Sequence, residues 1–560
     1  LEHTPAVAPG GEETVEEHGD SPAVLPWLLS AHTPGALRAQ AARLADHLDR
    51  VEATPTAVGR ALLGSRSLLA HRAVVIGTDR ADLLTGARAL AEGTATAPAV
   101  VTGTAGPTGR GPVFVFPGQG SQWAGMAVEL LRTSPVFTAR MTQCEQALSA
   151  YVDWSLTEVL STGAELDRVD VVQPVLWAVM VSLAEVWRSY GVEPAAVVGH
   201  SQGEIAAAVV AGALSLADGA RVVALRSKAL LALSGQGGMA SVQLSADEVR
   251  TLSPLADGRV EVAAVNGPSS VVVAGSPECL DQVITEAEAR GARAKRVEVD
   301  YASHSVHVER LHDELLTLLG DVTPTESRTP FFSTVTAGRL DTTELDAEYW
   351  YRNLRSTVRL EPAVRGLVEA GHHVFVEISP HPVLTAPIAQ TVETTDTEPL
   401  VVGTLRRGEG GLARMYASLA ELAVAGVPVD WAPAYPDHGL ASPGAPVDLP
   451  TYAFQRSRHW PQALPGAPVT DPAHEEFWRA VEEQDMAALA ATLDLPADEP
   501  ALRTVLPALS SWRRTRRERG TVDAWRYAVD WRPVDLPAAP AVLPGTWLIA
   551  LPEASRDDPA

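Results

Sequence analysis

A serine between two glycines is the strongest chemical signal in the chain, in the stretch Gly199-His200-Ser201-Gln202-Gly203. It follows an apolar run at 195–198 and precedes a run of helical composition at 204–208, which predicts a strand, a sharp turn and a helix. A serine on such a turn is lifted from the backbone, and the N–H groups of the following helix favour negative charge beside it. Ser201 is therefore a candidate nucleophile, although a chance match is the alternative because the pattern is short.

Three further segments could complete a site around this serine. The glycines on either side of Gln119, in the segment 116–122, expose a backbone N–H that could stabilise an oxyanion, unless the segment is a plain turn. His304 follows a strand-like segment among small polar residues, as a general base for a serine would, and its context sets it apart from the other histidines. Arg226 lies in an Ala- and Val-rich helical stretch, so it is either a buried clamp for a carboxylate or a surface arginine.

Composition excludes several classes of function. The net charge of −25 argues against a nucleic-acid partner. Two isolated cysteines, Cys144 and Cys279, form neither a metal site nor a disulfide framework, which fits a reducing compartment. No apolar run approaches the roughly 20 residues of a membrane span, and no signal peptide is evident. We therefore expect a cytoplasmic protein without a membrane partner. We also expect that both ends of the sequence are internal positions of a longer polypeptide.

Composition also divides the 560 residues into segments. Residues 1–22 are polar and predict a flexible tether, and residues 23–105 predict a small α/β unit. Alternating strands and helices over 112–407 predict an α/β domain with a buried parallel sheet, in which 239–300 has the β-α-β-β-α-β order of a ferredoxin-like subdomain. The Pro-rich 428–460 is a linker or an extended strap, and its aromatic residues favour the strap. Residues 474–530 have a helical pattern, with a basic run at 513–517 that is most simply a solvated helix face.

These motifs together resemble a known family. The segments 116–122 and 199–203, Arg226, and Tyr301-Ala302-Ser303-His304 are similar to the malonyl-CoA:ACP transacylase family, and most similar to the acyltransferase domain of a modular type I polyketide synthase. The resemblance implies an α/β-hydrolase-like parallel-sheet subdomain with an inserted ferredoxin-like subdomain. It also implies that the flanks are a ketosynthase-to-acyltransferase linker (23–105), a post-acyltransferase linker (428–460), a helical linker or dimerisation-type element (474–530) and the start of a truncated ketoreductase structural subdomain (531–560).

The resemblance assigns a role to each matching residue. Ser201 would carry the acyl group as an ester, and His304 would move the protons as the second member of a serine–histidine dyad. The backbone N–H groups of Gln119 and Gln202 would form the oxyanion hole, and Arg226 would bind the free carboxylate of the extender unit. The CoA thioester and the phosphopantetheine of the carrier protein would be substrates, with no bound cofactor and no metal.

Further positions bear on selectivity and on orientation of the histidine. Gln173, Gln202 and the Tyr301–His304 motif resemble the methylmalonyl-selective version, whereas malonyl-selective relatives tend to have His-Ala-Phe-His at the last site. Serine at position 303 leaves room for a methyl group beside the α-carbon of the acyl group. The family orients its histidine through a backbone carbonyl, which we expect here from Ser333 or Thr334.

The resemblance also implies partners and leaves alternatives. We expect an acyl carrier protein, a ketosynthase in the same polypeptide and methylmalonyl-CoA as partners, in a homodimeric module. A malonyl-selective acyltransferase is the nearest alternative. An α/β-hydrolase-type thioesterase would place an acid between serine and histidine in chain order and needs no arginine clamp. A non-catalytic docking scaffold would have no reason to keep Ser201, His304 and Arg226 together.

Overall fold

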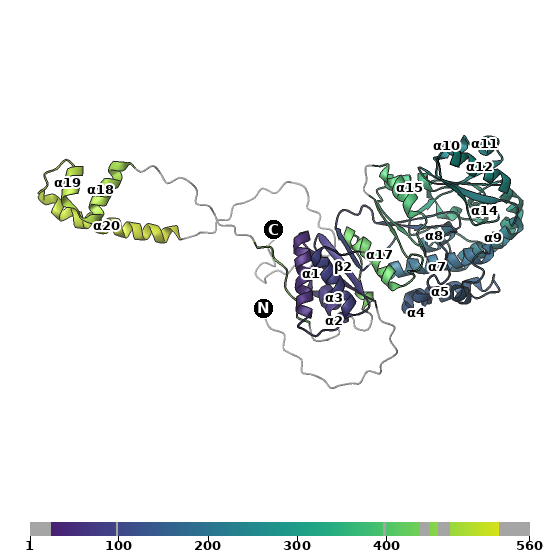
Figure 1. Ribbon diagram of the computed structural model, residues 1–560, viewed down its shortest axis with the longest axis horizontal. Coiled ribbons are helices and arrows are strands. Elements are labelled where there is room, and N and C mark those ends of the chain that lie inside the picture. Colours follow the sequence, from purple (N-terminus) through teal and green to yellow (C-terminus); the bar gives the residue numbers. More distant parts are fainter. Residues whose placement is uncertain (1–23, 97–98, 396–398, 436–446, 457–470, 526–560) are drawn as a thin grey trace, which may run out of the picture. The chain divides into compact units, whose positions relative to one another are not determined.

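The computed structural model describes residues 24–96, 99–395, 399–435, 447–456 and 471–525, drawn as ribbons in Figure 1. The chain divides into two compact units, Leu1–Arg456 and Ser457–Ala560. The expected tether at 1–22 and the expected ketoreductase segment at 531–560 lie outside the described residues.

The first part of the larger unit is a three-stranded antiparallel sheet in the order β1-β2-β3. Its strands are β1 (Leu25–Ala31), β2 (His71–Gly77) and β3 (Val100–Thr104), and its helices are α1 (Pro34–Leu48), α2 (Pro55–Ser65) and α3 (Arg80–Glu92). Helix α1 begins as its sequence predicts, because the Thr33 side chain accepts a hydrogen bond from the Ala36 backbone N–H and Pro34 occupies the first turn. Helix α17 (Leu412–Ala425), from the far end of the main domain, packs on β2 and β3 and ties the two parts together (Figure 1).

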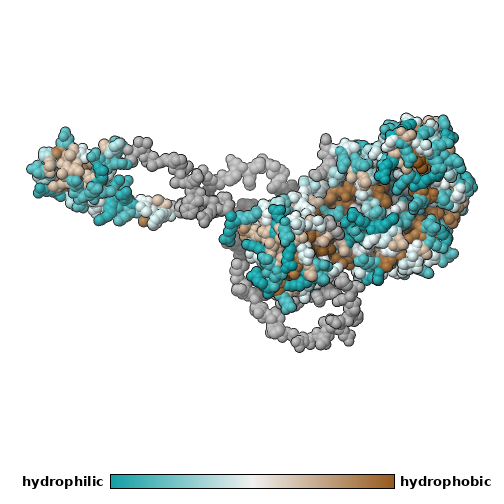
Figure 2. Space-filling model, in the orientation of Figure 1, coloured by the Kyte–Doolittle hydropathy of each residue, from teal (hydrophilic) through white to brown (hydrophobic). Residues whose placement is uncertain are grey.

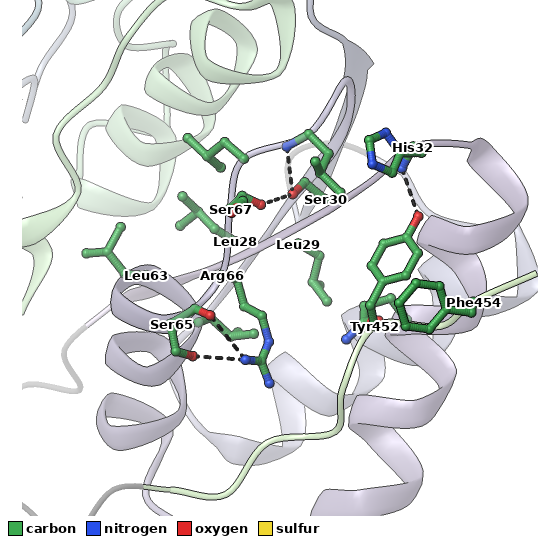
Figure 3. Close-up of a pocket in the computed structure, with 14 residues that line it drawn as sticks. Leu28, Leu29, Ser30, His32, Leu63, Ser65, Arg66, Ser67, Tyr452 and Phe454 are labelled. Carbon is green, nitrogen blue, oxygen red and sulfur yellow. Dashed lines mark hydrogen bonds between the residues drawn. The ribbon is translucent and has the colours of Figure 1, made fainter. Parts of the chain in front are cut away.

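The Pro-rich segment returns to this small sheet as an extended strap over the described residues 447–456. The Tyr452 hydroxyl accepts from the His32 backbone N–H at 3.0 Å, and the Ala453 N–H donates to the Gln40 side chain at 2.9 Å. Tyr452 and Phe454 form one wall of a cavity of about 510 Å³, whose other walls combine leucines of β1, of α2 and of the loop after α2 with polar side chains such as Ser30 and Arg66 (Figure 3). Over residues 447–456 the segment therefore has the strap conformation that its aromatic residues favour.

The main domain is built on a six-stranded sheet in the order β11-β10-β5-β4-β13-β14. All neighbouring strands pair in parallel except β11 at the edge. The strands are β4 (Pro112–Phe116), β5 (Ala196–Gly199), β10 (Phe331–Ser333), β11 (Gly338–Leu340), β13 (Val374–Glu377) and β14 (Leu400–Gly403). Strands β4, β5 and β13 are buried along their whole length, as expected for a parallel sheet covered on both faces.

Helices cover this sheet, and three of them position the site: α7 (Val169–Ser189), α8 (Gly203–Ala211) and α9 (Leu216–Leu230). Besides α17, the other helices of the domain outside the inserted subdomain are α4 (Val128–Thr133), α5 (Pro135–Leu148), α6 (Leu156–Thr162), α13 (His312–Leu319), α14 (Ala347–Arg355), α15 (Leu360–Glu369) and α16 (Thr385–Glu393). On the face shown in Figure 2, apolar residues of the larger unit gather in recesses between hydrophilic ridges.

Helix α7 corrects the expectation that no apolar stretch is long enough to span a membrane. Among the described residues it is the one helix that is long and apolar enough to do so by length and composition. However, 94% of its 18-residue apolar window is buried inside the protein, which is the pattern of a core helix.

A five-stranded sheet in the order β12-β7-β8-β6-β9 forms the inserted subdomain. Its strands are β6 (Gly238–Val242), β7 (Val260–Gly267), β8 (Ser270–Gly275), β9 (Ala294–Arg296) and β12 (Val358–Arg359), and its helices are α10 (Ala246–Arg250), α11 (Ser253–Ala256) and α12 (Pro277–Ala289). Strands β6 to β9 pair antiparallel in the order of the split βαβ arrangement. Strand β12, from outside the insertion, adds in parallel to β7 and joins the two subdomains.

The smaller unit contains α18 (Pro472–Glu483), α19 (Met486–Thr492) and α20 (Pro500–Ala524) around a small apolar core. The basic run lies on α20, where Arg513 and Arg517 pair with Glu482. The run is thus a helix face exposed to solvent, as the sequence predicts.

Candidate active site

Ser201 stands on a sharp turn between strand β5 and helix α8. Its backbone φ of 53° lies in the left-handed region, which is costly for a residue with a side chain and is typical of functional turns. The flanking glycines are required by close packing. A Cβ on Gly199 would lie 2.3 Å from the Glu204 Cα, and one on Gly203 would lie 2.1 Å from the Phe116 carbonyl oxygen.

The packing at Gly203 gives a testable prediction. Gly203→Ala forces a methyl group against backbone atoms that cannot move aside, so we expect it to lower the free energy of unfolding by about 1–3 kcal/mol or more. Gly366→Ala is the matched control, because Gly366 lies in α15 with no other atom within 4 Å of an added Cβ, and there alanine should stabilise the helix by up to about 1 kcal/mol. Denaturant titration of both variants measures the difference, and equal stability of the two would contradict this account of the turn.

The second residue of the site, His304, lies directly beside the serine. The Ser201 Oγ and His304 Nε2 atoms are 2.8 Å apart, and His304 is buried. His304 also has a left-handed backbone, with φ of 57°, and its N–H donates to the Leu354 carbonyl at 2.9 Å. The structure therefore brings together the two residues that the sequence predicts as nucleophile and base.

The group that orients the histidine differs from the expectation. His304 Nδ1 lies 2.8 Å from the backbone carbonyl oxygen of Ser356, so the prediction of Ser333 or Thr334 is wrong. Ser333 ends strand β10 and Thr334 follows it, and both bind other groups. The Thr334 N–H and hydroxyl donate to the Glu204 side chain, and the Ser333 and Tyr349 hydroxyl oxygens lie 2.8 Å apart. A carbonyl only accepts, so Nδ1 carries the proton and Nε2 is left to accept the Ser201 proton.

Two backbone N–H groups are available for a developing oxyanion. Within the described residues, no hydrogen bond uses the backbone N–H of Gln119 or of Gln202. Both residues line the cavity that contains Ser201. The Gln119 side chain is held by the Tyr301 hydroxyl at 3.0 Å, and that hydroxyl accepts from Gln173 at 3.4 Å. Tyr301 and Gln173 thus fix the loop that carries the Gln119 N–H.

Arg226 projects from α9 into the same cavity and is 1% exposed. Its Nη1 donates to the Gln173 side chain at 3.3 Å, and its Nη2 donates to the Asn353 side chain at 3.1 Å. Its Nε has no partner, and within the described residues no carboxylate lies within 4 Å of it. Burial lowers the pKa of Arg226 to about 10, which still leaves it charged at neutral pH. A buried cation held only by neutral amides is a site for an anionic ligand.

The cavity has a volume of about 280 Å³ and is lined by residues of both subdomains. Ser303 and Met239 lie on its wall, with the Ser303 hydroxyl 3.4 Å from the Met239 sulfur. Its interior therefore offers a nucleophile, a base, two N–H donors and a cation within one small space.

Comparison with known proteins agrees with this geometry. Residues 113–429, more than half of the chain, match the family model of the acyl transferase domain. The chain belongs to the acyl transferase domain family. The acyltransferase fold expected from the motifs is thereby confirmed, and so is the relation to modular polyketide synthases.

Individual relatives of this acyltransferase are polyketide synthases. Over 98% of its length it is 54% identical to polyketide synthase GfsA of Streptomyces halstedii, of which it spans only 7%. The acyltransferase domain from module 8 of the salinomycin polyketide synthase is 55% identical, with a TM-score of 0.71 over 73% of this chain and 97% of that one. A loading acyltransferase from the avermectin modular polyketide synthase is 50% identical, with a TM-score of 0.54 over 56% and 100% of the two chains. Residues 474–519 match the polyketide synthase dimerisation element domain.

Four residues of the acyltransferase site were not found from the sequence: Glu204, Tyr349, Asn353 and Ser356. Glu204 is fully buried on α8. Because it is the one acidic residue in an otherwise apolar helix, the sequence could have indicated that it has a role in the site. Tyr349 and Asn353 lie on α14 and donate to Glu204 at 2.6 and 2.9 Å. Ser356 acts through its carbonyl oxygen, which any residue type could supply.

Burial controls the electrostatics of the acyltransferase site. It lowers the pKa of His304 to about 3, with a further lowering contribution from the positive charge of Arg226. Burial also raises the pKa of Glu204 and raises the pKa of Tyr301 to about 12. His304 is thus neutral over the physiological range, as a base that accepts the Ser201 proton must be.

Proposed function

We propose that this acyltransferase moves a methylmalonyl group from CoA, through an ester on Ser201, to the phosphopantetheine thiol of an acyl carrier protein. The observation that carries the proposal is that the Ser201–His304 pair shares one cavity with the buried cation of Arg226, which forms no ion pair within the described residues. A hydrolase needs only the Ser201–His304 pair. A transferase for a carboxylated acyl group needs this pair and also the Arg226 cation.

The first half of the reaction loads the serine. His304 Nε2 accepts the proton of Ser201 Oγ, and the oxygen attacks the thioester carbonyl carbon. The N–H groups of Gln119 and Gln202 bind the oxyanion, each contributing about 3–4 kcal/mol to the barrier reduction. When the intermediate collapses, the C–S bond breaks and His304 gives its proton to the departing CoA sulfur.

The second half reverses these roles with a different thiol. The phosphopantetheine thiol of the carrier protein gives its proton to His304 Nε2, and its sulfur attacks the ester carbonyl on Ser201. The C–O bond then breaks and Ser201 Oγ recovers the proton. Throughout, the Ser356 carbonyl holds the Nδ1 proton of His304 and thereby keeps Nε2 facing the reacting atoms.

Arg226 selects for the free carboxylate of the acyl group. Its unpartnered Nε and the remaining protons of its Nη groups can donate to a carboxylate in the cavity. No bound cofactor or metal has a role in the proposed reaction, in which CoA and phosphopantetheine are substrates. Within the described residues there is no group of three metal-ligating side chains.

Intact-mass labelling tests the proposal. The native chain and Ser201→Ala are each exposed to equal concentrations of methylmalonyl-CoA, malonyl-CoA and propionyl-CoA. We expect a mass increase of one methylmalonyl group on the native chain only, formed faster than the malonyl adduct. Faster labelling by malonyl-CoA would support the malonyl-selective alternative, and steady release of free acid without carrier protein would support a thioesterase.

Methylmalonyl selectivity is further tested at position 303. Ser303→Phe fills the space beside Met239, so we expect the preference for methylmalonyl-CoA over malonyl-CoA to fall by about 10- to 200-fold, the value of one methylene group in a pocket. Ser303→Ala keeps that space open and should keep the preference. Competition labelling with both thioesters measures the ratio of the methylmalonyl to the malonyl labelling rate. An unchanged ratio in Ser303→Phe would show that residue 303 does not determine selectivity.

A further inference from the structure

An amide separates the two buried ionisable groups of the site. Arg226 on α9 and Glu204 on α8 are both essentially inaccessible to solvent, yet they form no ion pair. Asn353 lies between them: its Oδ1 accepts from Arg226 Nη2 at 3.1 Å, and its Nδ2 donates to Glu204 Oε2 at 2.9 Å. A single side chain thus contacts the cation on one end and the carboxyl group on the other.

The orientation of this amide is fixed by its partners. A guanidinium only donates, so it must face the Asn353 oxygen. The Asn353 nitrogen then faces two acceptors, the Glu204 carboxyl group and the backbone carbonyl of Ser201 at 3.2 Å. In the reverse orientation, the Asn353 NH2 group would face the donors of Arg226. The Asn353 oxygen would then face the oxygens of Glu204 and of the Ser201 carbonyl, which are both acceptors. The amide therefore holds Arg226 and the nucleophile turn in one bonded unit.

Glu204 has enough other donors to do without Arg226. The Thr334 N–H and the Thr334 hydroxyl both donate to its Oε1, at 2.5 and 2.7 Å. The Tyr349 hydroxyl donates to its Oε2 at 2.6 Å. Arg226, by contrast, has only the two neutral amides of Gln173 and Asn353 and an unpartnered Nε. The arrangement satisfies the internal acid, and within the described residues it leaves the cation without a carboxylate in direct contact.

We propose that Asn353 is a specificity-determining positioning residue, whose amide holds Arg226 toward the cavity while keeping it unpaired, so that the acyl carboxylate is its counter-ion. This inference rests on the proposed function of Arg226. It implies that the identity of residue 353, an amide in place of a carboxylate, decides whether the site selects carboxylated acyl groups. A carboxylate there would pair with Arg226 inside the protein and compete with the substrate.

Asn353→Asp tests this inference, because it places a carboxylate beside Arg226 in a side chain of nearly the same shape. It also removes the Nδ2 donor to Glu204 and to the Ser201 carbonyl, so labelling by propionyl-CoA serves as the reference for that loss. We expect labelling of Ser201 by methylmalonyl-CoA to fall by about 100-fold relative to labelling by propionyl-CoA, as an internal ion pair replaces the pair with substrate. The loss should appear mainly as a higher KM for methylmalonyl-CoA. Propionyl-CoA has no carboxylate, so its own labelling rate should change much less. An unchanged ratio of the two rates in Asn353→Asp would overturn the inference.

Two further variants separate an ion pair from other causes. Gln173→Glu places a carboxylate on the other contact of Arg226 and should lower the same ratio, which keeps the test available if Asn353→Asp does not fold. Asn266→Asp introduces a charge elsewhere in the same cavity, on a residue that contacts His200, and should keep the ratio near that of the native chain. An equal loss of the ratio in Asn266→Asp would show a general effect of negative charge and would contradict the role of Asn353.

The native chain is measured first, so that the two proposals fail separately. If methylmalonyl-CoA does not label native Ser201, the proposed function fails whatever the variants do. If it does and the ratio resists both Asn353→Asp and Gln173→Glu, only the inference about Asn353 fails. A fluorophosphonate that reacts with the activated serine reports folding of the site in each variant without using the clamp.

Discussion

Replacing His304 with alanine is expected to slow acylation of Ser201 by about 10⁴- to 10⁶-fold, as when one member of a serine–histidine pair is lost. His304 Nε2 lies 2.8 Å from the serine oxygen, and no other base within the described residues hydrogen-bonds to that oxygen. The variant keeps the oxyanion donors and Arg226, so binding of acyl-CoA should change little. Quenched-flow labelling followed by intact mass gives the rate.

The control for this prediction is a histidine outside the site. His312 is partly exposed and bonds to Asp313, so His312→Ala should acylate Ser201 at the native rate. A native-like rate in His304→Ala would mean that another group removes the serine proton, and the mechanism proposed above would be wrong.

The pKa of His304 adds a pH dependence to this prediction. Because that pKa is lowered to about 3, the histidine stays neutral from pH 8 down to about pH 4, and acylation should not fall near pH 6.5 through protonation of His304. The unfolded chain binds a proton at this histidine near pH 6.5 and the folded chain does not. Stability from this group is therefore present above pH 6.5 and is lost as the pH falls from 6.5 toward 3. His304→Ala should have a smaller loss of stability across that window.

The chemistry of the site could be predicted from the sequence wherever a residue type is rare in its surroundings. Ser201 stands between two glycines that the turn requires, and Arg226 interrupts an apolar helical stretch. His304 was found by its small polar neighbours. Each of these patterns is local, so the sequence contains it directly.

The remaining parts of the site depend on contacts between distant segments. Ser356 acts through a backbone carbonyl, and its side chain gives no signal of that role. The family resemblance placed this role at Ser333 or Thr334, but the chain reaches His304 from the turn after α14. Asn353 bridges α9 and α8 from a third helix, a relation that no spacing in one sequence reveals.

The same distinction holds for the fold. The alternation of strands and helices over 112–407 predicted the buried parallel sheet that contains β4, β5 and β13. The β-α-β-β-α-β order predicted the antiparallel sheet of β6 to β9. The addition of β12 to that sheet could not be predicted, because it is a two-residue strand that follows α14.

Removal of the cation is the second large effect expected. Arg226→Ala should reduce acylation by methylmalonyl-CoA by about 10²- to 10⁴-fold, because a buried ion pair that loses one partner costs about 3–5 kcal/mol. Propionyl-CoA offers no carboxylate, so its acylation of Ser201 should persist, and it should gain from the change. Arg226 lowers the pKa of His304, and without that positive charge the imidazolium formed during proton transfer is easier to reach.

Arg221 provides the matched control for this prediction, since it lies on the same helix α9 but faces Asp321 at 2.6 Å and has no place in the cavity. Arg221→Ala should keep the native ratio of methylmalonyl to propionyl labelling, whereas Arg226→Ala should invert it. If both variants keep the ratio, the carboxylate is bound elsewhere, and the unpaired state of Arg226 then needs another explanation. If Arg226→Ala loses both substrates equally, Arg226 serves the serine and histidine themselves, through the Asn353 amide that joins it to the Ser201 carbonyl. The inverted ratio alone identifies Arg226 as the group that distinguishes an extender unit from a simple acyl chain.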